Sequence, residues 1–211
     1  MKNNKAKKSD LIMEAALRIF AEKNFKEVPI SEIAEEAGVA VGTVYEHFKN
    51  KEDLLFSLPL KSADIFDEQL QLHLEGLHSP IEKIRKYIWF YLYFSKHNPV
   101  FTELLLFELR NSKNFFNTRK QRGMLKSMAV ILNLIEEGQA QGEIRNDVSP
   151  FMLRHMIIGT LEHVSTYWLL KERDTDITSY SNDVATMVLS GIVTRGGNNH
   201  VGGAREATGS N

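Results

Sequence analysis

The fold is decided by the stretch Ile30-Ser-Glu-Ile-Ala-Glu-Glu-Ala-Gly38-Val-Ala-Val-Gly-Thr-Val-Tyr-Glu-His-Phe-Lys-Asn-Lys51, in which two short apolar segments meet at Gly38. Apolar residues recur at helical spacing in both segments. Helices shorter than roughly 12–15 residues are marginal in water, so these two must pack on each other and on a neighbour. Glycine tolerates the left-handed conformation that a sharp reversal after a helix requires. The stretch therefore predicts a helix-turn-helix, whose second helix enters the DNA major groove.

The composition is that of an ordinary globular protein, with 43% apolar and 25% charged residues in a chain of 211. The absence of cysteine excludes disulfides and thiolate metal sites. The basic N-terminus is followed by a polar amphipathic segment instead of a signal core, and the longest apolar run, 87–94, is far below the ~20 residues of a membrane span. We therefore expect a cytoplasmic protein. A net charge of −1 argues against a general polyanion binder, so any nucleic-acid footprint must be local.

Apolar periodicity and helix-start signals predict an all-α protein of about nine helices. Ser9 and Asp10 can cap the first helix, and Asn50 with Asp53 can start the fourth. Pro59 is the proline that opens no helix, so we expect it either to kink or to break the fourth one. Three later helices begin with a capping side chain followed by proline, at Ser79-Pro80, Asn98-Pro99 and Ser149-Pro150.

An ordered series of residues in the first quarter of the chain carries a family resemblance. The series is Ala15-Ala16, Phe20, Asn24-Phe25, Ile33-Ala34, Ala37-Gly38-Val39, Gly42-Thr43-Val44-Tyr45, His47-Phe48, Asn50-Lys51-Glu52 and Leu54-Leu55. In this order the residues resemble the N-terminal domain of the TetR family of bacterial transcriptional regulators. The resemblance implies a DNA-binding head over 1–52 and a helical ligand-binding and dimerisation body over 53–195. The stretch 196–211, rich in Gly, Asn and Ala, is predicted to be a disordered tail.

Seven residues are the candidates for contact with DNA. Gly42 allows close approach of the DNA backbone, and the hydroxyls of Thr43 and Tyr45 suit phosphate contacts. The complete set is Val41, Gly42, Thr43, Tyr45, Glu46, His47 and Lys51. Val41 can meet a thymine methyl group, while Glu46 either accepts from cytosine or avoids the groove. Ala40 stands where the family commonly has serine, which weakens the cap of the recognition helix by ~1 kcal/mol.

Aromatic and aliphatic residues in the body offer the wall of an effector pocket, with ordinary core packing as the alternative for each. The candidates are Phe90, Tyr91, Phe94, Phe101, Leu105, Arg110, Met128, Ile131, Glu162, His163 and Tyr167. The two C-terminal helices, which pair across the dimer in the family, offer the interface. Its candidates are Met152, Met156, Gly159, Leu161, Val164, Val188, Leu189 and Ile192.

A narrower resemblance concerns the effector. Glu108-Leu109-Arg110, Gly142-Glu143-Ile144-Arg145 and the run from Arg154 to His163 are similar to the fatty-acid-degradation repressors of the FadR type within the TetR family. This resemblance implies that a long-chain acyl-CoA releases the protein from DNA. The CoA phosphates would then meet a basic run that otherwise is a solvated helix face, Arg119, Lys120, Arg122 and Lys126.

Enzymatic motifs are missing from the sequence. It has no phosphate-binding glycine loop, no His-Glu-x-x-His zinc motif and no cysteine nucleophile, so we expect neither an enzyme nor a cofactor or metal site. Together with the TetR resemblance, the sequence predicts a ligand-responsive transcriptional regulator, a repressor, that binds a palindromic DNA operator as a homodimer. The alternative is a helical small-molecule or partner-binding protein that has lost DNA binding.

Overall fold

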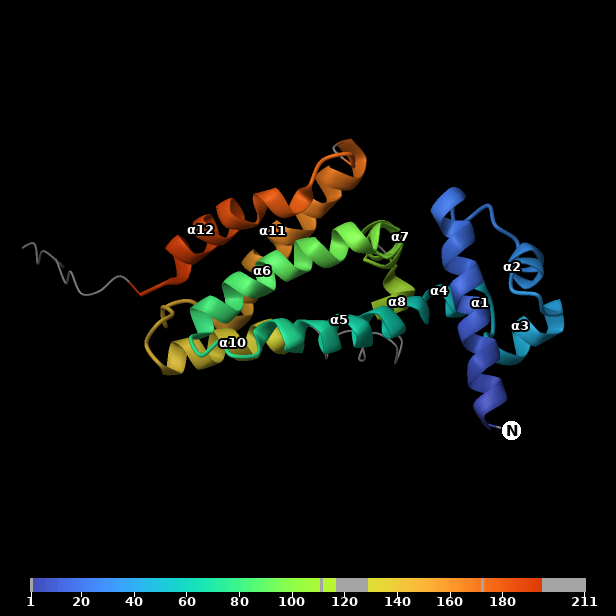
Figure 1. Cartoon of the computed structure of the whole chain (residues 1–211), viewed down its shortest axis with the longest axis horizontal. Helices are drawn as coiled ribbons and strands as arrows, with labels where there is room; N and C mark the ends of the chain where they lie inside the picture. The colour runs from blue at the N-terminus through green and yellow to red at the C-terminus, as the bar shows by residue number, and fades with distance from the viewer. Residues whose placement is uncertain (1, 111, 117–128, 172, 195–211) are drawn as a thin grey trace, which may run out of the picture.

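The computed structural model describes residues 2–110, 112–116, 129–171 and 173–194. Within these ranges every regular element is a helix, which confirms the all-α prediction, and extended backbone pairs only in an isolated bridge between Ile144 and Val193. The molecule is elongated, with a small head formed by α1, α2 and α3 at one end and the longer helices of the body at the other (Figure 1). None of the helices in the described ranges combines the length and the apolar composition that a membrane span requires.

The head consists of α1 (Lys2–Glu22), α2 (Ile30–Glu36) and α3 (Val41–His47). α1 packs against both short helices, and Gly38 turns the chain between them with a φ of 65°, the left-handed conformation that the sequence predicts. The three helices form the predicted helix-turn-helix. Full burial of one Val or Ile side chain contributes roughly 1.5–3 kcal/mol. The apolar core of the head includes Ile12, Ala16, Phe20, Val28, Ile33, Val44 and Phe48.

The start of α1 differs from the prediction. The helix begins at Lys2, so Ser9 and Asp10 lie inside it and do not cap it. Four of the seven residues from 2 to 8 are lysine, a good helix former, and serine or aspartate inside a helix costs at most about 0.7 kcal/mol relative to alanine. The predicted capping role of these two residues was therefore wrong, because the preceding segment continues the helix.

The fourth helix breaks just before Pro59 instead of being kinked by it. α4 (Lys51–Leu55) ends before it, and α5 (Leu58–Leu74) contains it in the first turn, where its missing N–H is harmless. The break, one of the two expected outcomes, is confirmed, whereas the expectation that Pro59 opens no helix was wrong. The start of α4 is as predicted, since Asn50 Oδ1 accepts from the Asp53 amide at 2.7 Å.

The body is organised around α6 (Pro80–His97). α5, α10 (Ala129–Ala140), α11 (Pro150–Lys171) and α12 (Ser181–Ile192) pack around this helix, and a short 3₁₀ turn η2 (Ile177–Tyr180) precedes α12 (Figure 1). Ser79 caps α6, because its Oγ accepts from the Ile81 amide at 3.2 Å. Gly142, with a φ of 76°, follows α10 at the predicted stop. The body core therefore lies between α6 and the helices that surround it.

A connecting segment joins the body to the head. It comprises α7 (Pro99–Glu103), the π-helix η1 (Leu104–Leu109) and α8 (Lys113–Phe116). This segment and the break before Pro59 bring the described ranges to eleven α-helices, where about nine were expected. The apolar core of the head extends into the connecting segment. Four side chains of the connecting segment belong to the same apolar cluster as the head, namely Leu104, Leu105, Leu109 and Phe115.

Candidate functional site

The outer face of α3 is open to solvent. Val44 and Phe48 are buried in the head, as predicted, whereas Val41 is 40% and Tyr45 is 53% exposed. Tyr45 is therefore no structural aromatic of the head core, and its hydroxyl is free to reach a ligand. The remaining candidates on this helix are exposed or half-buried, namely Gly42, Thr43, Glu46 and His47.

The N-terminal end of α3 has the features that the sequence predicts. Ala40 occupies the N-cap position and supplies no side-chain acceptor for the first amides of the helix. A Cβ atom built on Gly42 would meet no atom within 4 Å, so the surface beside it is open. A short helix with polar side chains, an open glycine and unscreened N-terminal amides can enter a DNA groove and contact phosphates.

The ammonium group of Lys51 forms its hydrogen bonds within the protein. Its Nζ donates to the carbonyl oxygens of Phe25 at 2.7 Å, Lys26 at 3.1 Å and Val28 at 2.8 Å, and it lies 4.6 Å from the centroid of the Phe25 ring. An ammonium group has three N–H donors, so all of them are in use. This geometry leaves no free N–H of Lys51 for the contact with DNA that the sequence predicts. The side chain instead joins α4 to the loop between α1 and α2. The helix-cap signals near Lys51 in the sequence do not reveal this contact.

A second candidate site is a small apolar cavity of about 60 Å³ in the body. It lies where α5, α6, α7, η1 and α11 meet. Four of the predicted pocket residues line it, namely Tyr91, Phe94, Phe101 and Leu105. Phe66 of α5 and Ile158 of α11 also line it and were not predicted, because apolar periodicity places them equally well in an ordinary core.

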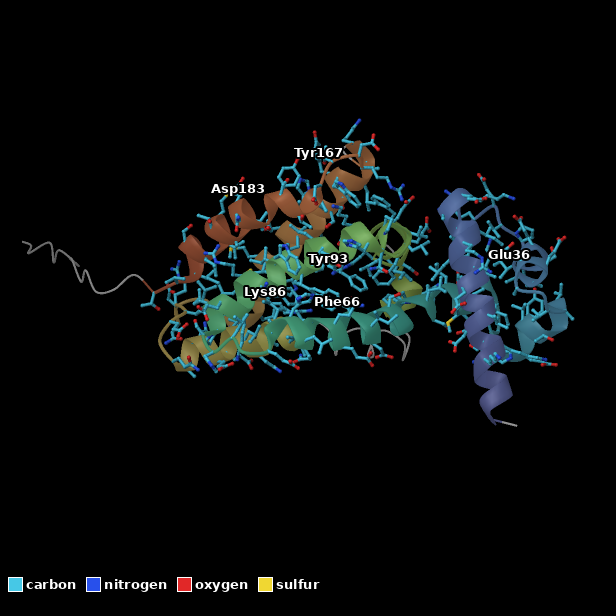
Figure 2. All side chains as sticks on the ribbon, in the orientation of Figure 1. Glu36, Phe66, Lys86, Tyr93, Tyr167 and Asp183 are labelled. Atoms are coloured by element: carbon cyan, nitrogen blue, oxygen red, sulfur yellow. The ribbon has the colours of Figure 1, made fainter. Side chains whose placement is uncertain are left out.

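Phe66 connects the two walls of this cavity. Its ring centroid lies 6.0 Å from that of Tyr87, 5.0 Å from Phe90, 6.3 Å from Tyr91 and 5.1 Å from Phe94. Figure 2 shows Phe66 between α5 and α6. Edge-to-face and tilted aromatic pairs of this kind contribute about 0.5–1.5 kcal/mol each beyond the area that they bury. Any ligand that enters the cavity must displace part of this cluster.

The other predicted pocket residues lie elsewhere. Phe90 and Ile131 are fully buried in the body core and do not line the cavity. His163 is exposed, and Tyr167, which is 54% exposed, lies on the outer side of α11 (Figure 2). Their assignment to the pocket was therefore wrong. Apolar residues occur all round this helix, which leaves the phase of its inner face undefined in the sequence. Met128 and the basic run 119–126 lie outside the described residues.

A polar cluster adjoins the apolar cavity. Arg110 and Glu162, both predicted pocket residues, form an ion pair between the end of η1 and α11. Burial raises the pKa of Tyr87 and of Tyr91 above the usual value for tyrosine, so both hydroxyls keep their protons. Burial also lowers the pKa of Arg110. The charge of Arg154 also acts on Tyr87, whose pKa it lowers. Arg154 was not predicted as a site residue, although a charged residue in an apolar helix is a signal that could have identified it.

The predicted dimer residues divide into two groups. Met152, Met156 and Gly159 are exposed, and Val164 is half-buried. The rest belong to the body core and were wrongly placed at an interface, namely Leu161, Val188, Leu189 and Ile192. They point inward because α11 and α12 pack against α6 through these faces. The outer face of the two helices carries other large apolar side chains, Phe151, Tyr167, Leu170 and Met187, all exposed.

Two family models of known proteins together match most of the chain. The family model of bacterial regulatory proteins of the tetR family matches residues 12–58, and that of the YsiA-like protein C-terminal region matches residues 61–191. The fatty acid metabolism regulator protein of Bacillus subtilis is 35% identical over 185 residues, which cover 86% of this chain and 93% of that protein.

Solved structures agree in fold. The transcriptional regulator FadR from Bacillus subtilis, in complex with stearoyl-CoA, superimposes with a TM-score of 0.76 and 30% identity over 86% of this chain and 98% of that one. The fatty acid degradation regulator FadR from Bacillus halodurans gives a TM-score of 0.76 and 28% identity over 87% and 95% of the two chains. This chain therefore belongs to the TetR family of bacterial regulatory proteins, and it is a ligand-responsive, DNA-binding transcriptional regulator and not an enzyme.

Proposed function

We propose that this protein is a homodimeric repressor that binds a palindromic operator and is released by a long-chain acyl-CoA. The similar FadR of Bacillus subtilis was crystallised with stearoyl-CoA, and the cavity in the present chain is walled by aromatic and aliphatic side chains that suit an acyl chain. A regulator that acts on chromosomal DNA works in the cytoplasm, which is the location that we propose.

The observation that carries the proposal is that the cavity and the head share side chains. Leu105 lines the cavity and is also part of the apolar core of the head, and Phe101 lines the cavity and packs against that core. Since protein interiors are close-packed, a ligand that moves these two residues must also repack the head. Release of DNA by an effector requires that the effector interact differently with two conformations of the protein, and this shared packing would provide that difference.

The size of the cavity supports a change of shape on binding. Its volume is about 60 Å³, whereas pockets that enclose drug-sized ligands measure about 300–1,000 Å³. A long acyl chain therefore requires a conformation in which this cavity is larger.

The outer face of α11 and α12 supports the homodimer. Met152, Phe151, Leu170 and Met187 expose 60%, 60%, 63% and 66% of their surface, and large exposed apolar patches mark association sites. A two-fold axis through this face would place two heads on the same side for successive half-sites of DNA.

Met187→Glu sets like charges near each other across such an axis. Sedimentation equilibrium should then show a monomer. The control Leu72→Glu, at an equally exposed apolar residue on α5, should stay dimeric.

An electrophoretic mobility shift assay tests the function. The probe is the DNA upstream of the protein's own gene, titrated with protein at several salt concentrations. Allosteric coupling of about 1–3 kcal/mol corresponds to a 5–150-fold loss of operator affinity when stearoyl-CoA is added. CoA without an acyl chain should have no effect. Binding that persists unchanged at saturating stearoyl-CoA would remove the effector assignment, and the absence of any specific shift would remove the operator.

A further inference from the structure

The charges of the head are unevenly distributed along the chain. Residues 9–58 contain ten acidic and five basic side chains, whereas residues 2–8 contain four lysines and no acidic residue. DNA carries one negative charge per ~1.7 Å of its axis, so an acidic domain is repelled from it unless cations lie near the contact. The segment 2–8 therefore holds the largest excess of positive charge that the head can offer to DNA.

Most of the other basic residues of the head form contacts within the protein. Arg18 and Lys23 form ion pairs with carboxylates of α2, at 2.7 Å and 2.5 Å. The ammonium group of Lys51 donates to three backbone carbonyl oxygens. Lys26 and Lys49 are exposed, and they are the two basic residues of the stretch 9–58 that remain to offset its ten acidic side chains.

The lysine-rich segment continues α1 beyond the core of the head. α1 begins at Lys2, whereas the apolar core begins at Ile12, so about 15 Å of helix precedes the core. Lys8 lies four residues before Ile12 and eight before Ala16, and it therefore continues the face of α1 that is buried in the core. Lys7 and Lys8 are both exposed.

This extension of α1 lies next to the recognition helix. α1 contacts α3, and Figure 1 shows the N-terminal turns of α1 projecting past α3. Cations near the N-terminus of a helix are unfavourable, because the helix dipole already places positive charge there. A bound polyanion would remove this repulsion. The position and the charge of the extension therefore both favour contact with the DNA that α3 enters.

We propose that Lys7 and Lys8 bind phosphate groups beside the groove that α3 occupies, and that they replace the phosphate contact for which Lys51 has no free N–H. The inference rests on DNA binding by the head, which is part of the proposed function. Both lysines precede residue 12, where the match to the tetR family model begins, so membership of the family assigns them no role. Phosphate contacts carry no sequence information, so the two lysines add affinity for any duplex while α3 reads the operator.

The test measures how the affinity for DNA depends on salt concentration. The full-length protein is titrated onto a labelled duplex from the region upstream of its own gene, and onto a scrambled duplex of the same length and composition. A lysine that neutralises one phosphate contributes ~0.9 to the slope of log affinity against log salt concentration. In the variant Lys7→Gln with Lys8→Gln, the slope should fall by about 1.8 for each bound head on both duplexes, and affinity at physiological salt should fall at least about tenfold.

Two control variants separate local contacts from overall charge. Lys7→Arg with Lys8→Arg keeps both positive charges and should keep the wild-type slope. Arg85→Gln with Lys113→Gln removes two exposed cations from α6 and α8, and should leave the slope unchanged although the net charge changes equally. Thermal unfolding should give the wild-type melting temperature for every variant, because all four side chains are exposed.

Two results would overturn the inference. One is the wild-type slope in the folded Lys7→Gln, Lys8→Gln variant. The other is an equal fall in slope in the control that lacks Arg85 and Lys113. Failure of the proposed function looks different, because stearoyl-CoA would then leave operator binding intact, or both duplexes would bind alike, while the loss of Lys7 and Lys8 still lowers the slope on both.

Discussion

Replacing Lys51 by methionine removes the ammonium group that joins α4 to the α1–α2 loop and retains most of the apolar stem. The wild-type Nζ donates to three carbonyl oxygens at 2.7–3.1 Å and lies over the Phe25 ring. A hydrogen bond to a charged group contributes ~1.5–3 kcal/mol, and an exposed cation–π contact adds ~0.5–1 kcal/mol. The three hydrogen bonds share one donor group and are not additive, so we expect the free energy of unfolding to fall by about 2–4 kcal/mol in total.

Chemical denaturation and operator binding together decide between a structural and a DNA-contacting lysine. A phosphate contact contributes ~0.9 to the slope of log affinity against log salt concentration. If Lys51 is structural, the midpoint of unfolding falls in the methionine variant, while the salt slope of the folded variant matches the wild type. Lys26→Met, at an exposed lysine of the same loop, should leave stability unchanged. Unchanged stability with a slope reduced by about 0.9 would refute the structural reading.

Three further predictions concern separate parts of the molecule. Tyr45→Phe removes an exposed hydroxyl, so operator affinity should fall about tenfold in a mobility shift with no change in melting temperature; unaltered affinity would exclude a contact. Gly138→Ala places a Cβ 2.6 Å from the Ile144 side chain, and thermal unfolding should show a loss of about 1–3 kcal/mol. Hydrogen bonds from Thr178 help to lower the pKa of Asp176 from 3.8 to about 2. The carboxylate therefore stabilises the fold above pH 3.8 and ceases to do so towards pH 2, a dependence that should be absent from the acid unfolding of Asp176→Asn.

The head could be predicted from the sequence because its determinants are local. The left-handed Gly38, the Asn50 cap and the inward-facing Val44 each depend on neighbours within a few residues, and all are found as expected. The errors in the head arise from contacts between distant segments. Lys51 meets carbonyl groups 23 to 26 residues earlier in the chain, and no pattern near Lys51 signals that distance.

The body was harder to predict because its helices are apolar on several sides. On α11, Met156 is exposed and Leu161 is buried, yet both are large apolar residues and were assigned to the same interface. A helix that is apolar all round gives no preferred face, so only its packing partners decide which side is internal. The cavity raises the same difficulty on a larger scale. Its wall combines side chains such as Phe66 and Ile158 from five separate elements, and their convergence is a property of the tertiary structure.

The π-helix η1 shows how the two parts of the molecule are connected. The amide of Arg110 donates to the Leu105 carbonyl at 3.0 Å, five residues back, so the helix is locally wider than an α-helix. This wider turn presents Leu105 to both the cavity and the head core, while Arg110 at its end reaches Glu162 on α11. An effector that contacts the cavity and the polar cluster therefore acts on the two ends of one short element. Because packed cores change between discrete arrangements and do not deform continuously, displacement of that element would be transmitted to α1 and the recognition helix without a separate pathway.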